Sequence, residues 1–149
     1  PSVGRRLVHC SAARAIQGRA MRGRLGPAKR KDFDTGNALG PWLVTRDEIP
    51  DPHNLAMTAR VNGETWSQGN SSEMHFSFAD ILAYISQDET LFPGEFIGSG
   101  TVGSGCGLEL DRWLQPGETV ELEVAGLGVL RNHIGGDGQH RATDNIARD

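Results

Sequence analysis

Apolar residues recur at helical spacing in one segment of the chain. One face of this segment is formed by the residues at positions i, i+3, i+4 and i+7, which are Phe78, Ile81, Leu82 and Ile85. Ser77 comes directly before them and is a favoured N-cap residue, while Asp80 in the first turn suits the helix dipole. The spacing therefore predicts a short amphipathic helix that begins near residue 78.

Two other segments show the patterns of β-hairpins. Asn62-Gly63 separates the runs LAMTARV and ETWSQGN, and this dipeptide favours a tight turn because both of its residues tolerate positive φ. Residues 119–124 alternate apolar and polar side chains, as a half-buried strand does, and the run LGVLRNHI after them is the expected partner strand. The chain is therefore predicted to contain at least two hairpins.

Turns and loops are predicted for much of the remaining chain, which has 20 glycines. Pro93-Gly94 predicts a turn, and the residues after it predict a buried strand that leads into a glycine-rich loop at 98–107. Residues 42–44 predict a short strand, and residues 12–21 are compatible with a short helix. Several strands, one clear helix and long glycine loops predict a single α+β domain that is mainly β.

Charge is unevenly divided along the 149 residues. Residues 1–31 have nine Lys or Arg and no acidic residue, whereas residues 32–149 contain all 19 acidic residues, so formal charges of +9 and −13 give the net charge of −4. Three hypotheses fit the basic segment: an arm that binds nucleic acid, an organelle transit peptide, or a segment that lines a site.

Other global features limit the possible classes of protein. No apolar run reaches the roughly 18 residues that a membrane-spanning helix needs, so no membrane association is expected. Cys10 and Cys106 lie far apart and form no CxxC pair, which indicates neither a disulfide framework nor a zinc site. A reducing, cytoplasmic location is expected.

Residues 29–45 (KRKDFDTGNALGPWLVT) combine cations, acids, a Thr and a Gly-Pro-Trp corner, which is more specific chemistry than a surface linker usually has. This segment is followed by other motifs, and the series runs KDFDTGNALGPW, VNGE, FSFADILAYIS, TLFPGEFIGSGTVGSG and LQPGETVELEVAGLGVLRN. The series resembles the fumarylacetoacetate hydrolase family, specifically the C-terminal part of its catalytic domain. The resemblance covers residues 10–134.

The resemblance implies a fold and a reaction class. The implied fold is the mixed β-sandwich roll of the fumarylacetoacetase C-terminal domain, truncated on its N-terminal side, with the partial catalytic domain at 1–134 and a flexible polar tail at 135–149. Family members hydrolyse carbon–carbon bonds of β-diketones, decarboxylate β-keto acids or isomerise related acids. The resemblance implies a metal-dependent hydrolase or lyase of a dioxo acid, with Mg²⁺ or Mn²⁺, acting as a homodimer in aromatic compound catabolism.

The resemblance also implies roles for individual residues. Lys31 is implied to be catalytic, because an ammonium group beside the substrate stabilises the enolate that carbon–carbon cleavage leaves. Glu109 matches a catalytic Glu that orients a water-activating His. Substrate binding is implied for Arg14, Gln17 and Thr101.

The expected metal site departs from the family pattern. Thr35 matches a residue near the metal shell, but Cys10 stands where an Asp ligand belongs, and Ala15 stands where a second Asp falls. A thiol is a poor ligand for a hard cation such as Mg²⁺. The family's acidic E-x-E segment and catalytic His, which lie upstream, have no counterpart in this sequence. The isolated chain is therefore expected to be incomplete, and the alternative is an inactive fragment or a binding module that retains the fold.

The resemblance favours one of the three hypotheses for the basic segment. Motif matches span residues 14–31, which disfavours a transit peptide, and no aromatic residue lies among the arginines, which disfavours nucleic-acid binding. The excess of positive charge suits a small anionic keto acid as substrate. His53, His75 and His133 show no ligand spacing and are expected to be structural or exposed.

Overall fold

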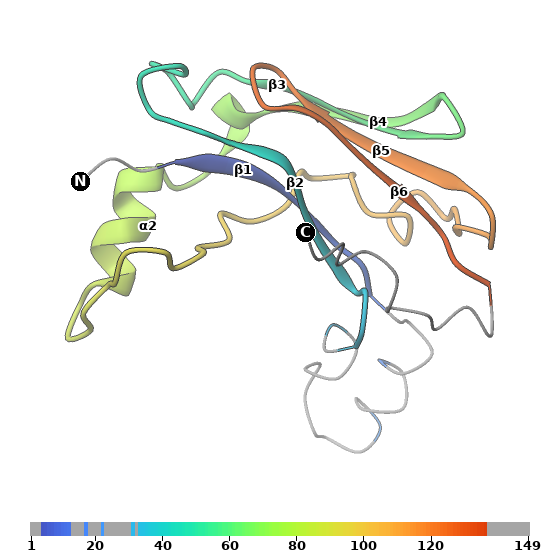
Figure 1. Cartoon of the computed structure of the whole chain (residues 1–149), viewed down its shortest axis with the longest axis horizontal. Coiled ribbons are helices and arrows are strands. Elements are labelled where there is room, and N and C mark those ends of the chain that lie inside the picture. Colours follow the sequence, from blue (N-terminus) through green and yellow to red (C-terminus); the bar gives the residue numbers. More distant parts are fainter. Residues whose placement is uncertain (1–3, 13–16, 18–21, 23–30, 32, 137–149) are drawn as a thin grey trace, which may run out of the picture.

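The computed structural model describes residues 4–12, 17, 22, 31 and 33–136 (Figure 1). The elements in chain order are β1 (Arg5–Cys10), β2 (Asn37–Val44), β3 (Ala56–Val61), β4 (Glu64–Asn70), the 3-10 helix η2 (Ser71–Glu73), α2 (Phe78–Ile85), β5 (Thr119–Val124) and β6 (Gly128–His133). This mainly-β arrangement, with one α-helix among the elements described, confirms the predicted fold class.

Four strands form an antiparallel sheet in the order β4-β3-β5-β6. The predicted turn joins β3 to β4, where Asn62 and Gly63 adopt φ of 50° and 83°. The second predicted hairpin pairs β5 with β6, and Leu122 lies opposite Leu130 in that ladder. Both hairpin predictions are confirmed, because they rest on local alternation and on turn residues that the chain supplies itself.

The other two strands, β1 and β2, form a separate antiparallel pair that lies beneath the four-stranded sheet (Figure 1). The two sheets meet where β2 contacts β6 and β1 contacts β5. A core cluster fills the space between them, and its buried members are Leu7, Val44, Ile49, Val124, Leu127 and Leu130. This core holds the end of β1 in a defined position relative to the larger sheet.

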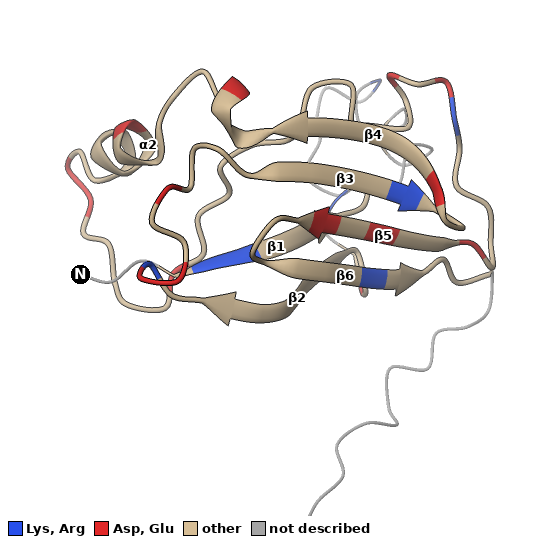
Figure 2. Cartoon of the chain, turned by 90° about the horizontal axis from the view of Figure 1, so that it is seen from above, with Lys and Arg blue, Asp and Glu red and all other residues tan. Residues whose placement is uncertain are grey.

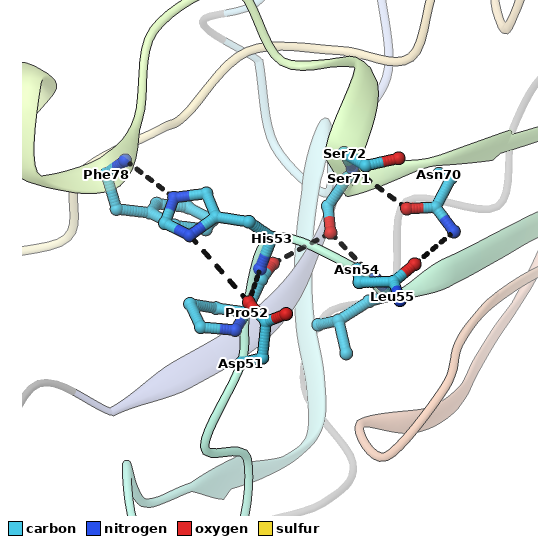
Figure 3. A network of polar contacts seen from close by, with 9 residues as sticks. All are labelled: Asp51, Pro52, His53, Asn54, Leu55, Asn70, Ser71, Ser72 and Phe78. Atoms are coloured by element: carbon cyan, nitrogen blue, oxygen red, sulfur yellow. Dashed lines mark hydrogen bonds and ion pairs between the residues drawn. The ribbon is translucent and has the colours of Figure 1, made fainter.

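Helix α2 begins where the sequence predicts. The Ser77 hydroxyl accepts a hydrogen bond from the Asp80 N–H at 3.1 Å, and the Asp80 carboxylate accepts one from the Ser77 N–H at 2.9 Å. These contacts form a capping box. Hydrogen bonds to the Asp80 carboxylate from the Ser77 hydroxyl, at 2.6 Å, and from the Ser77 N–H hold the pKa of Asp80 below its usual value. The His53 ring joins the same turn, since its Nε2 accepts from the Phe78 N–H at 3.2 Å (Figure 3).

The loop before β3 is tied to η2 by a further set of hydrogen bonds (Figure 3). The Ser71 hydroxyl is buried, donates to the Pro52 carbonyl at 2.7 Å and accepts from the Leu55 N–H at 2.8 Å. His53 lies next to these contacts, where its N–H donates to the Asp51 carboxylate at 2.9 Å, in line with the structural role expected for it.

Three local predictions differ from the structure. The predicted buried strand after Pro93-Gly94 is wrong, because residues 95–100 are irregular and Phe96 is 64% exposed. Strand β2 begins at Asn37 rather than near residue 42 and runs through a cis Gly40-Pro41 peptide. Strand β1 was not predicted at all. The possible helix at 12–21 lies almost entirely outside the described residues. Residues 137–149 of the predicted tail lie outside them as well.

A membrane-spanning helix would have to be long and apolar, and none of the helices in the described part of the chain meets that requirement.

Candidate active site at the end of the β1–β2 ladder

Two of the predicted site residues meet at the end of the two-stranded sheet. Cys10 is the last residue of β1, and the Lys31 Nζ lies 3.2 Å from its Sγ. Both residues are exposed to solvent. The described residues contain no carboxylate that pairs with this ammonium group. Among the described residues, the Lys31 ammonium therefore contacts a thiol and no carboxylate.

Hydrogen bonds among the described residues hold the backbone around this pair. The Asn37 side-chain amide donates to the Lys31 carbonyl at 3.3 Å, and Asn37 is also the ladder partner of Cys10. The Ser11 N–H donates to the Gly36 carbonyl at 2.8 Å, and the Gly36 N–H donates to the Phe33 carbonyl at 3.0 Å. These contacts bring the segment around residue 31 back against the end of β1.

Thr35 lies in the turn that precedes β2. Its φ of 62° is in the left-handed region, which is uncommon for a β-branched residue, and its side chain is exposed. The next residue, Gly36, accepts a hydrogen bond from the Ser11 N–H at its carbonyl, and Ser11 directly follows Cys10. Thr35 is therefore near the Cys10–Lys31 pair along the backbone. Its expected role beside a metal shell stays a prediction.

Two further predicted site residues, Thr101 and Glu109, lie on the loop of residues 101–112, which packs against β4. A Cβ atom on Gly69 would meet Val102, and one on Gly105 would lie 3.6 Å from the Ser67 hydroxyl oxygen. Gly69 is the ladder partner of Met57, which packs against the core that also includes β1 and β2 residues. The loop therefore covers the same face of the four-stranded sheet as the two-stranded sheet does.

Arg112 anchors the end of this loop to β4. Its guanidinium donates to both Glu64 carboxylate oxygens, at 2.9 and 2.8 Å, and stacks over the Trp66 ring at 4.1 Å from the centroid. The hydrogen bonds with Arg112 lower the pKa of Glu64, and those with Glu64 raise the pKa of Arg112. Thr101, at the other end of the loop, is exposed and follows irregular chain rather than the predicted buried strand.

Glu109 lies in a turn of the same loop rather than in a strand. Its Oε2 accepts a hydrogen bond from the Cys106 N–H at 3.1 Å, so the carboxylate caps this turn. No imidazole among the described residues contacts it. The structure thus shows a structural contact of Glu109, and its predicted role in orienting a His remains a prediction.

The two remaining predicted residues are on the segment between β1 and β2. Gln17 is described and half-buried, whereas Arg14 lies outside the described residues. The structure brings Cys10 and Lys31 into contact, and Thr35 lies in the turn beside them along the backbone. It carries Thr101 and Glu109 on a separate loop over the same face.

His9 is a polar residue beside this site that the sequence did not single out. The Asn132 side-chain amide donates to its Nδ1 at 3.3 Å from the neighbouring sheet, so a neutral ring carries its proton on Nε2. Burial lowers the pKa of His9. Its position in the sequence, directly before Cys10, was the signal that could have pointed to it. That signal was not used because β1, in which the two residues lie on opposite sides, was not predicted.

The donors near Cys10 do not fit a hard divalent cation. The described part of the chain contains no group of three or more His, Cys, Asp or Glu side chains that could hold a metal ion. The donor at the position expected for a carboxylate is a thiol, whereas Mg²⁺ and Mn²⁺ prefer oxygen.

The family described as fumarylacetoacetate (FAA) hydrolase C-terminal matches residues 7–135. The match covers most of the chain, from the middle of β1 to just beyond β6. The chain belongs to this family.

Individual relatives agree with this assignment. The chain is 43% identical over 105 residues to the mitochondrial oxaloacetate tautomerase of Homo sapiens, a match that covers 70% of this chain and 33% of the relative. It therefore spans about a third of the length of that curated relative.

Solved structures show the same fold. A fumarylacetoacetate hydrolase from Exiguobacterium antarcticum superposes with a TM-score of 0.71 at 30% identity, covering 84% of this chain and 44% of that one. The fumarylpyruvate hydrolase from Pseudomonas aeruginosa, solved with Mn²⁺ and pyruvate, superposes with a TM-score of 0.75 at 23% identity. This match covers 89% of this chain and 54% of that chain.

Proposed function

We propose that this chain supplies the lysine-bearing side of an active site that acts on a small dioxo acid, by carbon–carbon cleavage or by keto–enol conversion. The observation that supports this most directly is the exposed Lys31 ammonium, which is fixed at the end of the β1–β2 ladder without a carboxylate partner in the described chain. Membership of a family whose relatives are named as hydrolases and tautomerases supports the reaction class.

The two reactions share an enolate. In hydrolysis, water adds to one carbonyl of the diketone, the carbon–carbon bond breaks, and its electron pair moves into the second carbonyl to form an enolate. In keto–enol conversion, removal of a proton next to the carbonyl forms the enolate directly. In both, a fixed cation at the enolate oxygen stabilises charge that develops in the transition state.

We assign the charge-stabilising role to Lys31 and the binding of the remaining substrate oxygens to Arg14, Gln17 and Thr101. The substrate is a carboxylic acid, and the surplus of basic residues at 1–31 favours such an anion. Thr101 is exposed on the loop that covers the same face of the sheet as β1. Glu109 would orient the group that activates water, with the turn around Cys106 as its anchor.

The metal that the family resemblance implies is Mg²⁺ or Mn²⁺. Such an ion would polarise the substrate carbonyls. Because the described donors do not form a site for it, each role above is assigned to side chains of this chain alone.

The test is an assay of the purified chain with two probes: oxaloacetate for keto–enol conversion and an acylpyruvate for carbon–carbon cleavage. Lys31→Met should lower turnover at least about tenfold, which corresponds to about 1.4 kcal/mol at the transition state. Lys29→Met is the matched control, because it removes the only other lysine, and it should leave turnover within about twofold.

Full turnover in Lys31→Met would contradict the proposed role of this residue. If the unaltered chain turns over neither probe, with or without added Mn²⁺, the chain is not a catalyst by itself. The binding-module alternative would then be supported by saturable binding of the same acids without turnover.

A further inference from the structure

The sulfur of Cys10 has no task in the reaction proposed above, yet it lies against a primary amine. The Lys31 Nζ is 3.2 Å from the Sγ, although the two residues are 21 positions apart in the chain. We refer to these two side chains as the thiol–amine pair. Both members are exposed, so a small reagent in solvent can reach them.

The folded backbone holds the thiol–amine pair together. Asn37 lies opposite Cys10 in the β1–β2 ladder and also donates its side-chain amide to the Lys31 carbonyl. The Ser11 N–H donates to the Gly36 carbonyl next to this point. The sulfur and the amine are thus brought within reach of a bond by contacts that do not involve either group.

Within the described chain, no strong interaction draws the Cys10 sulfur or the Lys31 nitrogen away from the other. The ammonium has no carboxylate partner in the described chain, and the other contact of the sulfur is a weak one to the Ser11 carbonyl at 3.9 Å. Cys106, the second cysteine, forms no disulfide and lies on the loop that packs against β4. An oxidised Cys10 sulfur therefore has the Lys31 amine as its neighbouring nucleophile.

We propose that the thiol–amine pair is a covalent modification site, at which a peroxide joins Cys10 to Lys31 through a reversible Sγ–Nζ bond. The thiol first reacts with one peroxide to give a sulfenic acid and water, so the sulfur is oxidised by two electrons and the peroxide is reduced. The Lys31 ammonium releases a proton to solvent, and the amine attacks the sulfur. A sulfur–nitrogen bond forms, the sulfur–oxygen bond breaks, and a second water leaves.

This bond has two consequences. It protects the sulfur from irreversible oxidation to the sulfinic and sulfonic acids, because the sulfenic acid is consumed. It also removes the positive charge of Lys31 until a thiol reductant reopens the bond. The bond itself follows from the geometry of the pair and does not depend on the reaction proposed for the site.

The experiment is peptide mapping by mass spectrometry after treatment with a small excess of hydrogen peroxide. Cys106→Ser is introduced first, because a Cys10–Cys106 disulfide would produce the same loss of two hydrogen atoms. The treated protein should lose two hydrogens, the peptides that contain Cys10 and Lys31 should be joined, and a thiol reductant should restore both. Lys29→Arg should behave in the same way.

Lys31→Arg is the decisive variant, since it keeps the charge but replaces the amine with a weakly nucleophilic guanidinium. It should lose the linkage and accumulate sulfinic or sulfonic acid at Cys10. The proposal is overturned if the Cys106→Ser protein forms only these acids with no link to Lys31. It is also overturned if Lys31→Arg is linked as readily through Lys29. Neither result bears on the dioxo acid assays, which have turnover as their readout.

Discussion

The basic side chains of the four-stranded sheet have carboxylate partners, whereas Lys31, at the end of the two-stranded sheet, has none among the described residues. On the larger sheet, the acidic residues of β5 lie between arginines of its neighbours, with Glu121 paired to Arg131 and Glu123 paired to Arg60 (Figure 2). Lys31, in contrast, contacts a thiol and no carboxylate within the described chain.

The difference separates structural charges from charges that are available to a ligand. Glu121 lies directly opposite both Arg60 and Arg131 in the strand ladders, so these charges pair across strands and support the register of the sheet. A cation without such a partner can be neutralised by an incoming oxyanion. Variants in the two regions should therefore affect different properties, stability in the first and function in the second.

The largest effect on stability is expected for Leu130→Ala in the core under the larger sheet. Leu130 is 8% exposed and belongs to the cluster that joins both sheets, so truncation leaves a cavity. The free energy of unfolding should fall by about 2–4 kcal/mol, measured by urea denaturation. Lys31→Met, measured alongside, should stay within about 0.5 kcal/mol of the parent. An equal loss in both variants would show that Lys31 is a structural charge after all.

A smaller loss is expected for Gly63→Val at the β3–β4 turn. Gly63 has a φ of 83°, where a β-branched side chain is strained although no atom lies within 4 Å of its Cβ position. The cost should be about 1 kcal/mol or more. Gly135→Val is a suitable control, because its Cβ position is also open and Gly135 has no positive φ. An unchanged melting temperature for Gly63→Val would contradict the turn.

A pH dependence of the free energy of unfolding is expected from His9, which lies beside the candidate site. This effect should be smaller than that of Gly63→Val and larger than that of Cys10→Asp. Burial puts the folded-state pKa of His9 below its ordinary value of 6.5, so the unfolded chain binds the proton more readily. The stability that His9 contributes is therefore present above about pH 6.5 and is lost as the pH falls through the folded pKa.

The measurement compares urea midpoints at about pH 7.5 and about pH 5.5, a window in which histidines titrate. His9→Gln should flatten the pH dependence, and it keeps a carbonyl that can accept from Asn132. His133→Gln, at an exposed position, should retain the slope of the parent. Identical slopes for His9→Gln and the parent would rule out His9 as the cause.

The smallest effect is expected for Cys10→Asp, which turns the thiol into a carboxylate. Magnesium affinity, measured by isothermal titration, should rise only slightly, because the described residues contain no set of three ligands to complete a site. The parent protein should instead prefer a softer ion such as Cd²⁺. Saturable Mg²⁺ binding by the parent at millimolar affinity or tighter would contradict the thiol's position at a lost ligand.

Local sequence patterns predicted part of the fold correctly. The Asn62-Gly63 hairpin, the strand pair at 119–133 and the helix at Phe78 are each specified by residues a few positions apart. Their turn chemistry, alternation and capping do not depend on distant contacts. The same patterns misled at residues 95–100, where Phe96 and Ile97 have strand-forming side chains but no partner strand pairs with them.

The sequence by itself determined the family, the hairpins, the helix and the choice of Lys31 as a candidate residue. Only the tertiary structure decided that β1 is a strand, because β1 pairs with β2, which is some 30 residues further along the chain, and its own pattern is short and rich in arginine. The contact between Lys31 and Cys10 depends on that pairing. Local periodicity reports which side chains share a face, whereas the meeting of two distant segments depends on packing that no local pattern records.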